Sequence, residues 1–289
     1  MMIDGHTRVC GLLGYPVEHT LSPVIHNTLA EFTGKNLAYL PFLVEKDKLA
    51  DAVRGAYALN VLGMNVTVPH KEKVLPFLME IDPLAERIGA VNTLVRVEGG
   101  YKGYNTDMPG LYRAMISDGI CVEGRQVIIL GAGGVARAVA VMLAGKAEKI
   151  YILNRTVEKA EAIAAEVNGF MGNRTVQAMP LAEYASLTGT DYLAIQATNI
   201  GMYPRTEEVI IEDEAFYRRI QTGYDLIFNP ADTKFMKLVR AAGGQAYNGL
   251  KMLLYQGIIA YELWNDVEIS DTQAAAVFER LKEASEKAS

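Results

Sequence analysis

The chain has 289 residues, half of them hydrophobic, which is long enough for one large domain or two of ordinary size. A net charge of −6 without a long basic run argues against nonspecific nucleic-acid binding, and no apolar run approaches the roughly 20 residues that a membrane-spanning helix needs. Two cysteines without a CxxC pattern, no metal-ligand spacing among the histidines, and a start without a signal peptide's apolar core lead us to expect a cytoplasmic, metal-free enzyme.

The first half of the chain alternates short apolar runs with longer amphipathic segments, a pattern typical of parallel strands covered by helices. The expected strands are 8–14, 36–44 and 63–68, and the expected helices are 22–34, 46–60 and 71–79, with a further helix opening at Asp82–Pro83. Ser22 is the expected N-cap of the first helix, and Pro23 its first residue. Two alternating strands joined at Gly99–Gly100 then form a hairpin.

The second half restarts the alternation. The expected strands are 125–131, 148–155, 190–198 and 223–229, and the expected helices are 134–145, 156–168, 231–243, 249–264 and 271–289. The repeated order of strand, helix and strand predicts a second parallel sheet. We therefore predict an α/β protein of two domains, with a boundary near Asp107.

A glycine-rich loop directly follows the strand at 125–131 and opens the next helix. The residues that match the pattern G-x-G-x-x-G/A are Gly131, Ala132, Gly133, Gly134, Val135 and Ala136. Glycine at the first position permits a tight turn, glycine at the third lets the backbone approach a pyrophosphate, and a small sixth residue allows close packing of helix on strand. Within this βαβ unit the loop predicts a dinucleotide site, against the plainer interpretation of an ordinary strand–turn–helix connection.

The end of the following strand indicates which dinucleotide is bound. NAD-specific sites usually carry Asp or Glu there, whereas this chain has Asn154, Arg155 and Thr156, with Lys159 one turn later. A carboxylate would repel a 2′-phosphate, and a guanidinium can pair with it. We therefore predict NADP as the cofactor, the alternative being that Arg155 is only a solvated charge.

A nicotinamide enzyme that reduces a ketone also needs a proton donor beside the carbonyl group. Lys71 follows the strand of "NVTVPHK", at the edge where ligands of parallel sheets bind. Asp107 ends "GYNTD" and could hold the ammonium group of Lys71 in place. The residues alone leave the alternative open that Lys71 is a solvated surface residue.

These motifs together resemble the shikimate dehydrogenase family, from about residue 8 to the last helix. The resemblance rests on "GYPVEHTLSPVIHN", "NVTVPHK", "GAVNT", "GYNTD", "GAGGVARA", "NRT" and "GLKMLLYQG". It implies NADP-linked interconversion of 3-dehydroshikimate and shikimate in aromatic amino-acid biosynthesis. It also implies a cleft between two domains: an N-terminal substrate-binding α/β domain with a mainly parallel sheet (1–107 plus 249–289) and a Rossmann-type NADP-binding domain (108–248).

The resemblance assigns roles residue by residue. Lys71 and Asp107 become the catalytic pair, in which either member could be the proton donor because such pairs titrate together. The implied substrate-binding residues are Thr20, Ser22, Asn65, Thr67, Asn92 and Gln256. The implied cofactor contacts beyond the two motifs above are Thr198, Met202, Gly249 and Met252.

Three positions depart from the family's usual pattern: Thr20 replaces a serine, Phe228 a tyrosine and Lys251 a glycine. Lys251 could supply a cation for the substrate acid, obstruct the site or point to solvent. These changes leave two alternatives open: a dehydrogenase of quinate or another cyclic hydroxy acid, and, in another class, a non-catalytic NADP-binding regulatory protein. We expect a small-molecule substrate and a monomer or homodimer.

Overall fold

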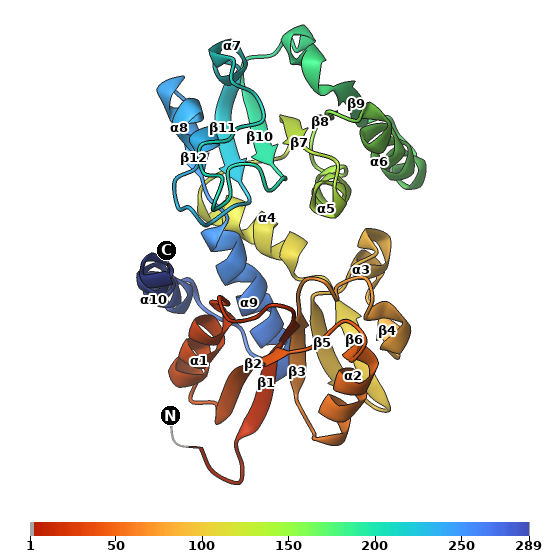
Figure 1. Ribbon diagram of the computed structural model, residues 1–289, viewed down its shortest axis with the longest axis vertical. Coiled ribbons are helices and arrows are strands. Elements are labelled where there is room, and N and C mark those ends of the chain that lie inside the picture. Colours follow the sequence, from red (N-terminus) through yellow and green to blue (C-terminus); the bar gives the residue numbers. More distant parts are fainter. Residues whose placement is uncertain (1–2, 289) are drawn as a thin grey trace. The chain divides into compact units, whose positions relative to one another are not determined.

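The computed structural model describes residues 3–288 and divides into two compact units (Figure 1). The first unit comprises the chain up to Ala114 and from Lys251 onward, and the second comprises Met115–Leu250. The sequence-based boundaries lie at residues 107 and 249. Among residues 3–288, no helix is both long enough and apolar enough to cross a membrane.

The first unit is built on a six-stranded sheet in the order β2-β1-β3-β5-β6-β4. Its strands are β1 (Arg8–Gly14), β2 (Leu37–Leu43), β3 (Gly63–Val66), β4 (Glu80–Ile81), β5 (Thr93–Val97) and β6 (Gly100–Tyr104). Only β5 runs against its neighbours, pairing antiparallel with both β3 and β6. The mainly parallel sheet that we predicted is therefore confirmed, and β1 has the predicted bounds.

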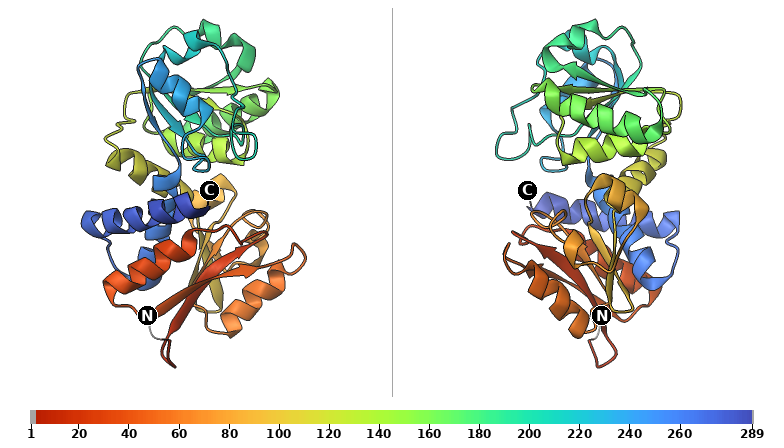
Figure 2. Two further views of the ribbon diagram at one scale, coloured as in Figure 1. Left: turned by 60° about the vertical axis from the view of Figure 1, so that its left-hand side comes forward. Right: turned by 90° about the vertical axis from the view of Figure 1, so that its right-hand side faces the viewer.

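Helices cover both faces of this sheet. The helices of the first unit are α1 (Ser22–Thr33), α2 (Leu49–Ala58), α3 (Pro83–Ile88), α9 (Leu250–Asn265) and α10 (Asp271–Ala288), and α4 (Asp107–Ser117) begins in it. α2 and α3 pack on the face that carries Met64 and Leu94, whereas α1 and α9 meet on the other, where Gly257 approaches Ile25. α10 lies against α1, and Arg280 of α10 forms an ion pair with Glu31 at 2.7 Å (Figure 2).

The second unit is a six-stranded, fully parallel sheet in the order β12-β11-β10-β7-β8-β9. Its strands are β7 (Gln126–Leu130), β8 (Lys149–Asn154), β9 (Val176–Pro180), β10 (Tyr192–Gln196), β11 (Ile220–Asp225) and β12 (Gln245–Tyr247). Its helices are α5 (Gly134–Leu143), α6 (Val157–Met171), α7 (Glu214–Tyr217) and α8 (Lys234–Ala241), and η2 (Leu181–Ser186) is a 3₁₀ segment. This strand order is that of the dinucleotide-binding Rossmann fold. The predicted Rossmann-type sheet is thus confirmed.

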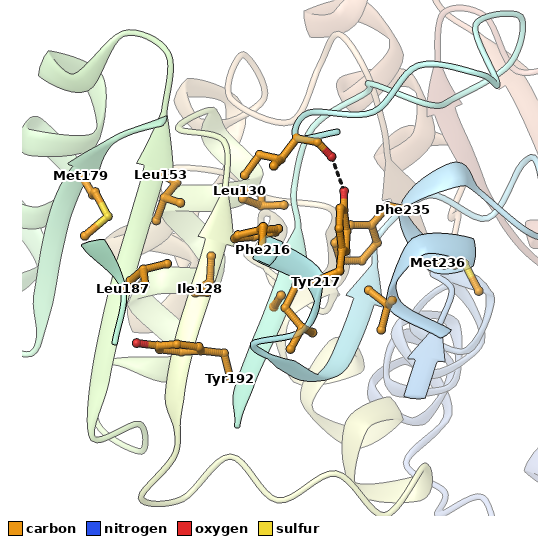
Figure 3. Close-up of a cluster of buried hydrophobic side chains, with 14 residues drawn as sticks. Ile128, Leu130, Leu153, Met179, Leu187, Tyr192, Phe216, Tyr217, Phe235 and Met236 are labelled. Carbon is orange, nitrogen blue, oxygen red and sulfur yellow. Dashed lines mark hydrogen bonds between the residues drawn. The ribbon is translucent and has the colours of Figure 1, made fainter. Parts of the chain in front are cut away.

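The core of the second unit lies between the sheet and the segments η2, α7 and α8 (Figure 3). Ile128 and Leu130 of β7 face Phe216 and Tyr217 of α7, and all four side chains are almost fully buried. The hydroxyl group of Tyr217 donates a hydrogen bond to the carbonyl of Ile211 at 2.6 Å. This packing fixes the carboxyl end of β7, directly before the glycine-rich loop.

Three local predictions were wrong. The helix expected at 71–79 is a turn followed by a single 3₁₀ segment, η1 (Leu75–Phe77), because Pro76 lacks the N–H of a helix interior and would clash with the preceding turn. β11 ends at Asp225, not at 229, because the carboxylate of Asp225 accepts a hydrogen bond from the amide of Ile227 and turns the chain. Leu21, not Ser22, is the N-cap of α1.

Candidate active site

Lys71 lies in the turn that follows β3, on the first unit. The buried side chain of His70 anchors this turn, since its Nε2 atom lies 2.7 Å from the carbonyl oxygen of Val44. The carbonyl of Lys71 itself accepts a hydrogen bond from the amide of Val91 at 2.9 Å. Held at both positions, the turn leaves the Lys71 side chain about one-third exposed, with its Nζ atom 2.6 Å from Oδ2 of Asp107. A lysine and a carboxylate 36 positions apart thus form an ion pair.

Asp107 is the first residue of α4, so its carboxylate lies at the positive end of that helix dipole. Its second oxygen, Oδ1, accepts a hydrogen bond from Nδ2 of Asn92 at 2.9 Å. The oxygen of the Asn92 side-chain amide is bonded too: Oδ1 accepts a hydrogen bond from the backbone N–H of Thr106 at 2.7 Å. Nδ2 of Asn92 lies 3.4 Å from Oε1 of Gln256, on α9. Four residues predicted for the site, from four different segments, therefore contact one another.

Asn65, in β3, is buried, and both ends of its amide group have protein partners. Its Nδ2 donates to Thr93 at 3.1 Å and to the carbonyl of Asn92 at 3.3 Å. Its Oδ1 accepts from the hydroxyl of Tyr39 at 2.8 Å and lies 3.1 Å from Nε2 of His26. The substrate contact expected of Asn65 stays a prediction, while the structure gives it a place inside a buried network.

Three hydroxyl groups predicted to bind substrate lie near the carboxyl edge of the first sheet. Thr20 donates to Oγ of Ser22 at 3.2 Å and accepts from the amide of Ser22 at the same distance. Thr67, directly after β3, is half-buried, and its hydroxyl has no protein partner within residues 3–288. A hydroxyl that is sheltered but free to bond suits a polar ligand.

His26 and Tyr39 belong to the network around Asn65, although we did not predict a role for either. Both are fully buried, and their rings stack with centroids 4.2 Å apart. Burial lowers the pKa of His26 to about 3, with the bond to Asn65 acting in the opposite direction. The imidazole is therefore neutral at physiological pH. The position of His26 four residues after Ser22, on the same helix face, could have indicated its involvement.

The glycine-rich loop of the second unit has the geometry of a pyrophosphate cradle. Gly131 has φ +109°, and a Cβ atom there would lie 2.5 Å from Cγ2 of Thr198. Gly133 is the N-cap of α5 and has no side chain to bond the first amides of the helix, and a Cβ atom there would meet nothing within 4 Å. Ala136 is fully buried, as close packing requires. Gly134 and Val135 are exposed beside the open helix end, and Ala132 is half-buried, so the residues present fit an anionic dinucleotide.

The end of β8 presents cations to solvent. Asn154 donates from Nδ2 to the carbonyl of Thr156 at 2.8 Å, and Thr156 is the N-cap of α6. Arg155 and Lys159 are exposed, and within residues 3–288 neither has an ion-pair partner. Arg155 also lines a cavity with Pro180, Leu181 and Tyr184. A 2′-phosphate would meet two unpaired cations and a helix N-terminus here, so these residues fit NADP.

The remaining predicted positions are distributed over both units. Thr198 follows β10 and binds Oε1 of Gln196, and Met202 is exposed in the next turn. Gly249 donates its amide to Ile227, and the backbone of Leu226 leaves no room for a Cβ atom there. Met252 is half-buried on α9, one turn before Gln256.

Lys251, one of the three departures, is engaged within the first unit. Its Nζ atom lies 5.7 Å from the centroid of the Phe278 ring, on α10. This contact directs the ammonium group toward α10. Phe228, the second departure, lies half-buried in the segment after β11.

Comparison with known proteins gives the family. Residues 12–94 match "Shikimate dehydrogenase substrate binding domain", and residues 115–218 match "Shikimate / quinate 5-dehydrogenase". A protein of Desulforamulus reducens named "Shikimate dehydrogenase (NADP(+))" is 42% identical, over 91% of both chains. The chain belongs to the shikimate dehydrogenase family.

Solved structures of similar proteins share the fold of this chain. A shikimate dehydrogenase crystallised with NADP⁺ superposes with a TM-score of 0.86 at 37% identity, covering 99% of this chain and 97% of that one. A 5-ketofructose reductase from a Gluconobacter strain superposes with a TM-score of 0.83 at 31% identity, covering 97% and 99%. The same fold therefore carries reductases named for different substrates.

Proposed function

We propose that this protein catalyses the reversible, NADP-dependent reduction of 3-dehydroshikimate to shikimate. The observation that carries the proposal is the Lys71–Asp107 ion pair, bound to Asn92 and close to Gln256, in a member of the shikimate dehydrogenase family. The relatives' names and their complexes with NADP and shikimate support the same reaction.

When bound, NADPH supplies the hydride that reduces the ring ketone. Lys71 is proposed to stand beside the ketone oxygen, where its ammonium group stabilises the developing alkoxide and the Lys71–Asp107 pair delivers the proton. Asp107 holds the ammonium in place with one oxygen and orients the amide of Asn92 with the other. Asn92, Gln256 and Thr67 are proposed to bind the substrate hydroxyls, and Thr20 and Ser22 its carboxylate.

We propose that the first unit binds the substrate and the second binds NADP. The exposed, unpaired Arg155 and Lys159 at the N-terminus of α6 support a preference for the 2′-phosphate. The net charge of −6 supports an enzyme without a nucleic-acid partner. A cytoplasmic monomer or homodimer is the form that we propose.

The departures at Thr20 and Phe228 support a second candidate, a dehydrogenase of quinate or another cyclic hydroxy acid. If the missing phenol binds the substrate acid in relatives, Phe228 forgoes a charge-assisted hydrogen bond worth about 1.5–3 kcal/mol. The contact of Lys251 with Phe278 does not favour its use as a replacement cation. A non-catalytic NADP-binding protein is disfavoured because it would have no use for the Lys71–Asp107 pair.

The test is NADP reduction with shikimate and with quinate, and NAD reduction with each, by wild type and Lys71→Ala. We expect shikimate and NADP to give the highest kcat/KM, and Lys71→Ala to lose at least about 10²-fold while NADPH binding, followed by its fluorescence, persists. Lys73→Ala, at an exposed neighbouring position, is the matched control. NADPH binding without shikimate turnover would contradict the proposal, and turnover of quinate alone would replace it with the second candidate.

A further inference from the structure

A chain of hydrogen bonds runs through the first unit from the buried hydroxyl of Tyr39 to the Lys71–Asp107 ion pair. Asn65, Thr93 and Asn92 are its links: Nδ2 of Asn65 donates to Thr93, whose hydroxyl donates to Oδ1 of Asn92 at 3.2 Å. Asn92 then donates to Asp107. All the residues between the two ends are buried, so water does not compete for these bonds.

Tyr39 stands at the buried end of this chain. Its hydroxyl donates to Oδ1 of Asn65 at 2.8 Å. Burial raises the pKa of Tyr39, so the phenol stays protonated and keeps donating this bond. The phenol hydroxyl therefore holds the far end of the amide network that reaches the ion pair.

The protein holds Tyr39 firmly. Its ring stacks on His26 at an interplanar angle of 15°, and its centroid lies 6.1 Å from that of the Trp264 ring. Its backbone N–H donates to Oδ1 of Asn27 at 2.9 Å, and its carbonyl accepts from Nδ2 of Asn27 at 3.2 Å. None of these contacts involves the phenol oxygen, so removal of the hydroxyl alone would leave the ring and the backbone in place.

We propose that Tyr39 is a positioning residue for the reaction: its hydroxyl fixes the amide of Asn65 and thereby orients Asn92 at the Lys71–Asp107 pair. This inference rests on the proposed function for its kinetic consequence, while the orientation of Asn65 can be measured without substrate. In Tyr39→Phe, Oδ1 of Asn65 keeps only His26 as a partner, so the amide of Asn65 is free to shift.

The experiment compares Tyr39→Phe with Tyr101→Phe. Tyr101 is also fully buried in the first unit, and its hydroxyl donates one hydrogen bond, to the carbonyl of Val61 at 2.9 Å, away from the chain described above. Both substitutions remove one buried hydroxyl and should lower Tm by similar amounts. The side-chain amide NMR signals of Asn65 and Asn92, assigned with Asn65→Asp and Asn92→Asp, are recorded for each protein without substrate.

We expect both amide signals to shift in Tyr39→Phe and neither to shift in Tyr101→Phe. We also expect Tyr39→Phe to lower kcat/KM for shikimate about tenfold, with the KM for NADP unchanged, because a buried hydrogen bond contributes on the order of that factor. Unchanged amide signals, or equal kinetic losses in the two variants, would overturn the proposal. If the wild type fails to oxidise shikimate but the amide signals shift only in Tyr39→Phe, the proposed function fails and the positioning role stands.

Discussion

Oδ2 of Asp107 lies 2.6 Å from Nζ of Lys71, although 36 positions separate the two residues in the chain. The same carboxylate binds Asn92 through its other oxygen. One side chain thus sets the position of both a cation and a hydrogen-bonding amide. A change in its charge should therefore affect more than the ion pair.

Asp107→Asn keeps the shape of the side chain and removes its charge. We expect kcat for shikimate oxidation to fall at least about 10²-fold, because the ammonium of Lys71 loses its counter-charge and the amide of Asn92 can meet another N–H donor. Steady-state kinetics with NADP measures this. Glu72→Gln, an exposed position beside Lys71, should keep kcat within about twofold. A similar loss in both variants would show that the Asp107 effect is nonspecific.

Gly131 and Gly133 should respond differently to alanine. Gly131→Ala places a Cβ atom 2.5 Å from Thr198 at φ +109°, so we expect a loss of about 1–3 kcal/mol in stability and a Tm lower by several degrees. Gly133→Ala has space for its Cβ within the protein, so its Tm should be unchanged while its Kd for NADPH rises about tenfold or more. Thermal unfolding and NADPH titration separate the two effects. Equal behaviour of the variants would argue against the pyrophosphate cradle.

Arg155→Ala removes one of two unpaired cations at the start of α6. We expect the KM for NADP to rise about 10- to 100-fold and the KM for NAD to change less than about threefold, since a charge-assisted hydrogen bond contributes about 1.5–3 kcal/mol. Arg174→Ala, which also removes an exposed guanidinium from the second unit, is the control and should change neither value. A parallel rise for both cofactors would mean that Arg155 contacts something other than the 2′-phosphate.

His26 should make the stability of the first unit depend on pH. Its pKa is about 3 in the folded protein, against an ordinary value of 6.5. Between these values the unfolded chain binds more protons, so stability falls as the pH drops below 6.5, by up to about 1.4 kcal/mol per pH unit. The rings and the amide around His26, from Tyr39, Tyr261, Trp264 and Asn65, carry no charge that would offset this.

His26→Gln should reduce that slope, because glutamine still donates to Asn65 but does not titrate. Denaturant unfolding at pH 7 and pH 5 gives the difference for each protein, and exposed His19→Gln should keep the wild-type difference. Burial raises the pKa of Asp225, in the second unit, to about 6, so its contribution falls as pH rises from 3.8 to 6. That contribution is common to all three proteins and cancels in the comparison. An undiminished slope in His26→Gln would contradict the prediction.

Local features of the fold could be predicted because local chemistry determines them. The glycine-rich loop, the helix opening at Asp82–Pro83 and the strand at 8–14 each depend on a few neighbouring residues, and the structure has all three. The short strands β9 and β12 and the helix α7 were not predicted, because their few residues show no clear periodicity. Tertiary pairing, not sequence pattern, stabilises such segments.

The contacts of the candidate site were harder to predict than its members. Lys71, Asp107, Asn92 and Gln256 came from motifs, but their meeting depends on β3, β5, α4 and α9 lying together. His26 and Tyr39 were missed because an apolar helix face and a strand give no sign that one histidine nitrogen and one phenol oxygen share a single acceptor. These two side chains meet at Asn65 because the folded backbone brings α1, β2 and β3 together.

The discontinuity of the first unit has a consequence for synthesis on the ribosome. Met115–Leu250 is one uninterrupted stretch, whereas the sheet of the first unit waits for α9 and α10, which are translated after the second unit. Until then the face that Trp264 later covers, where Gly63 leaves room for its indole, is exposed to solvent. The first sheet is thus completed only after the second unit has been made, and through that synthesis the nascent chain carries a sheet face that still lacks its covering helix.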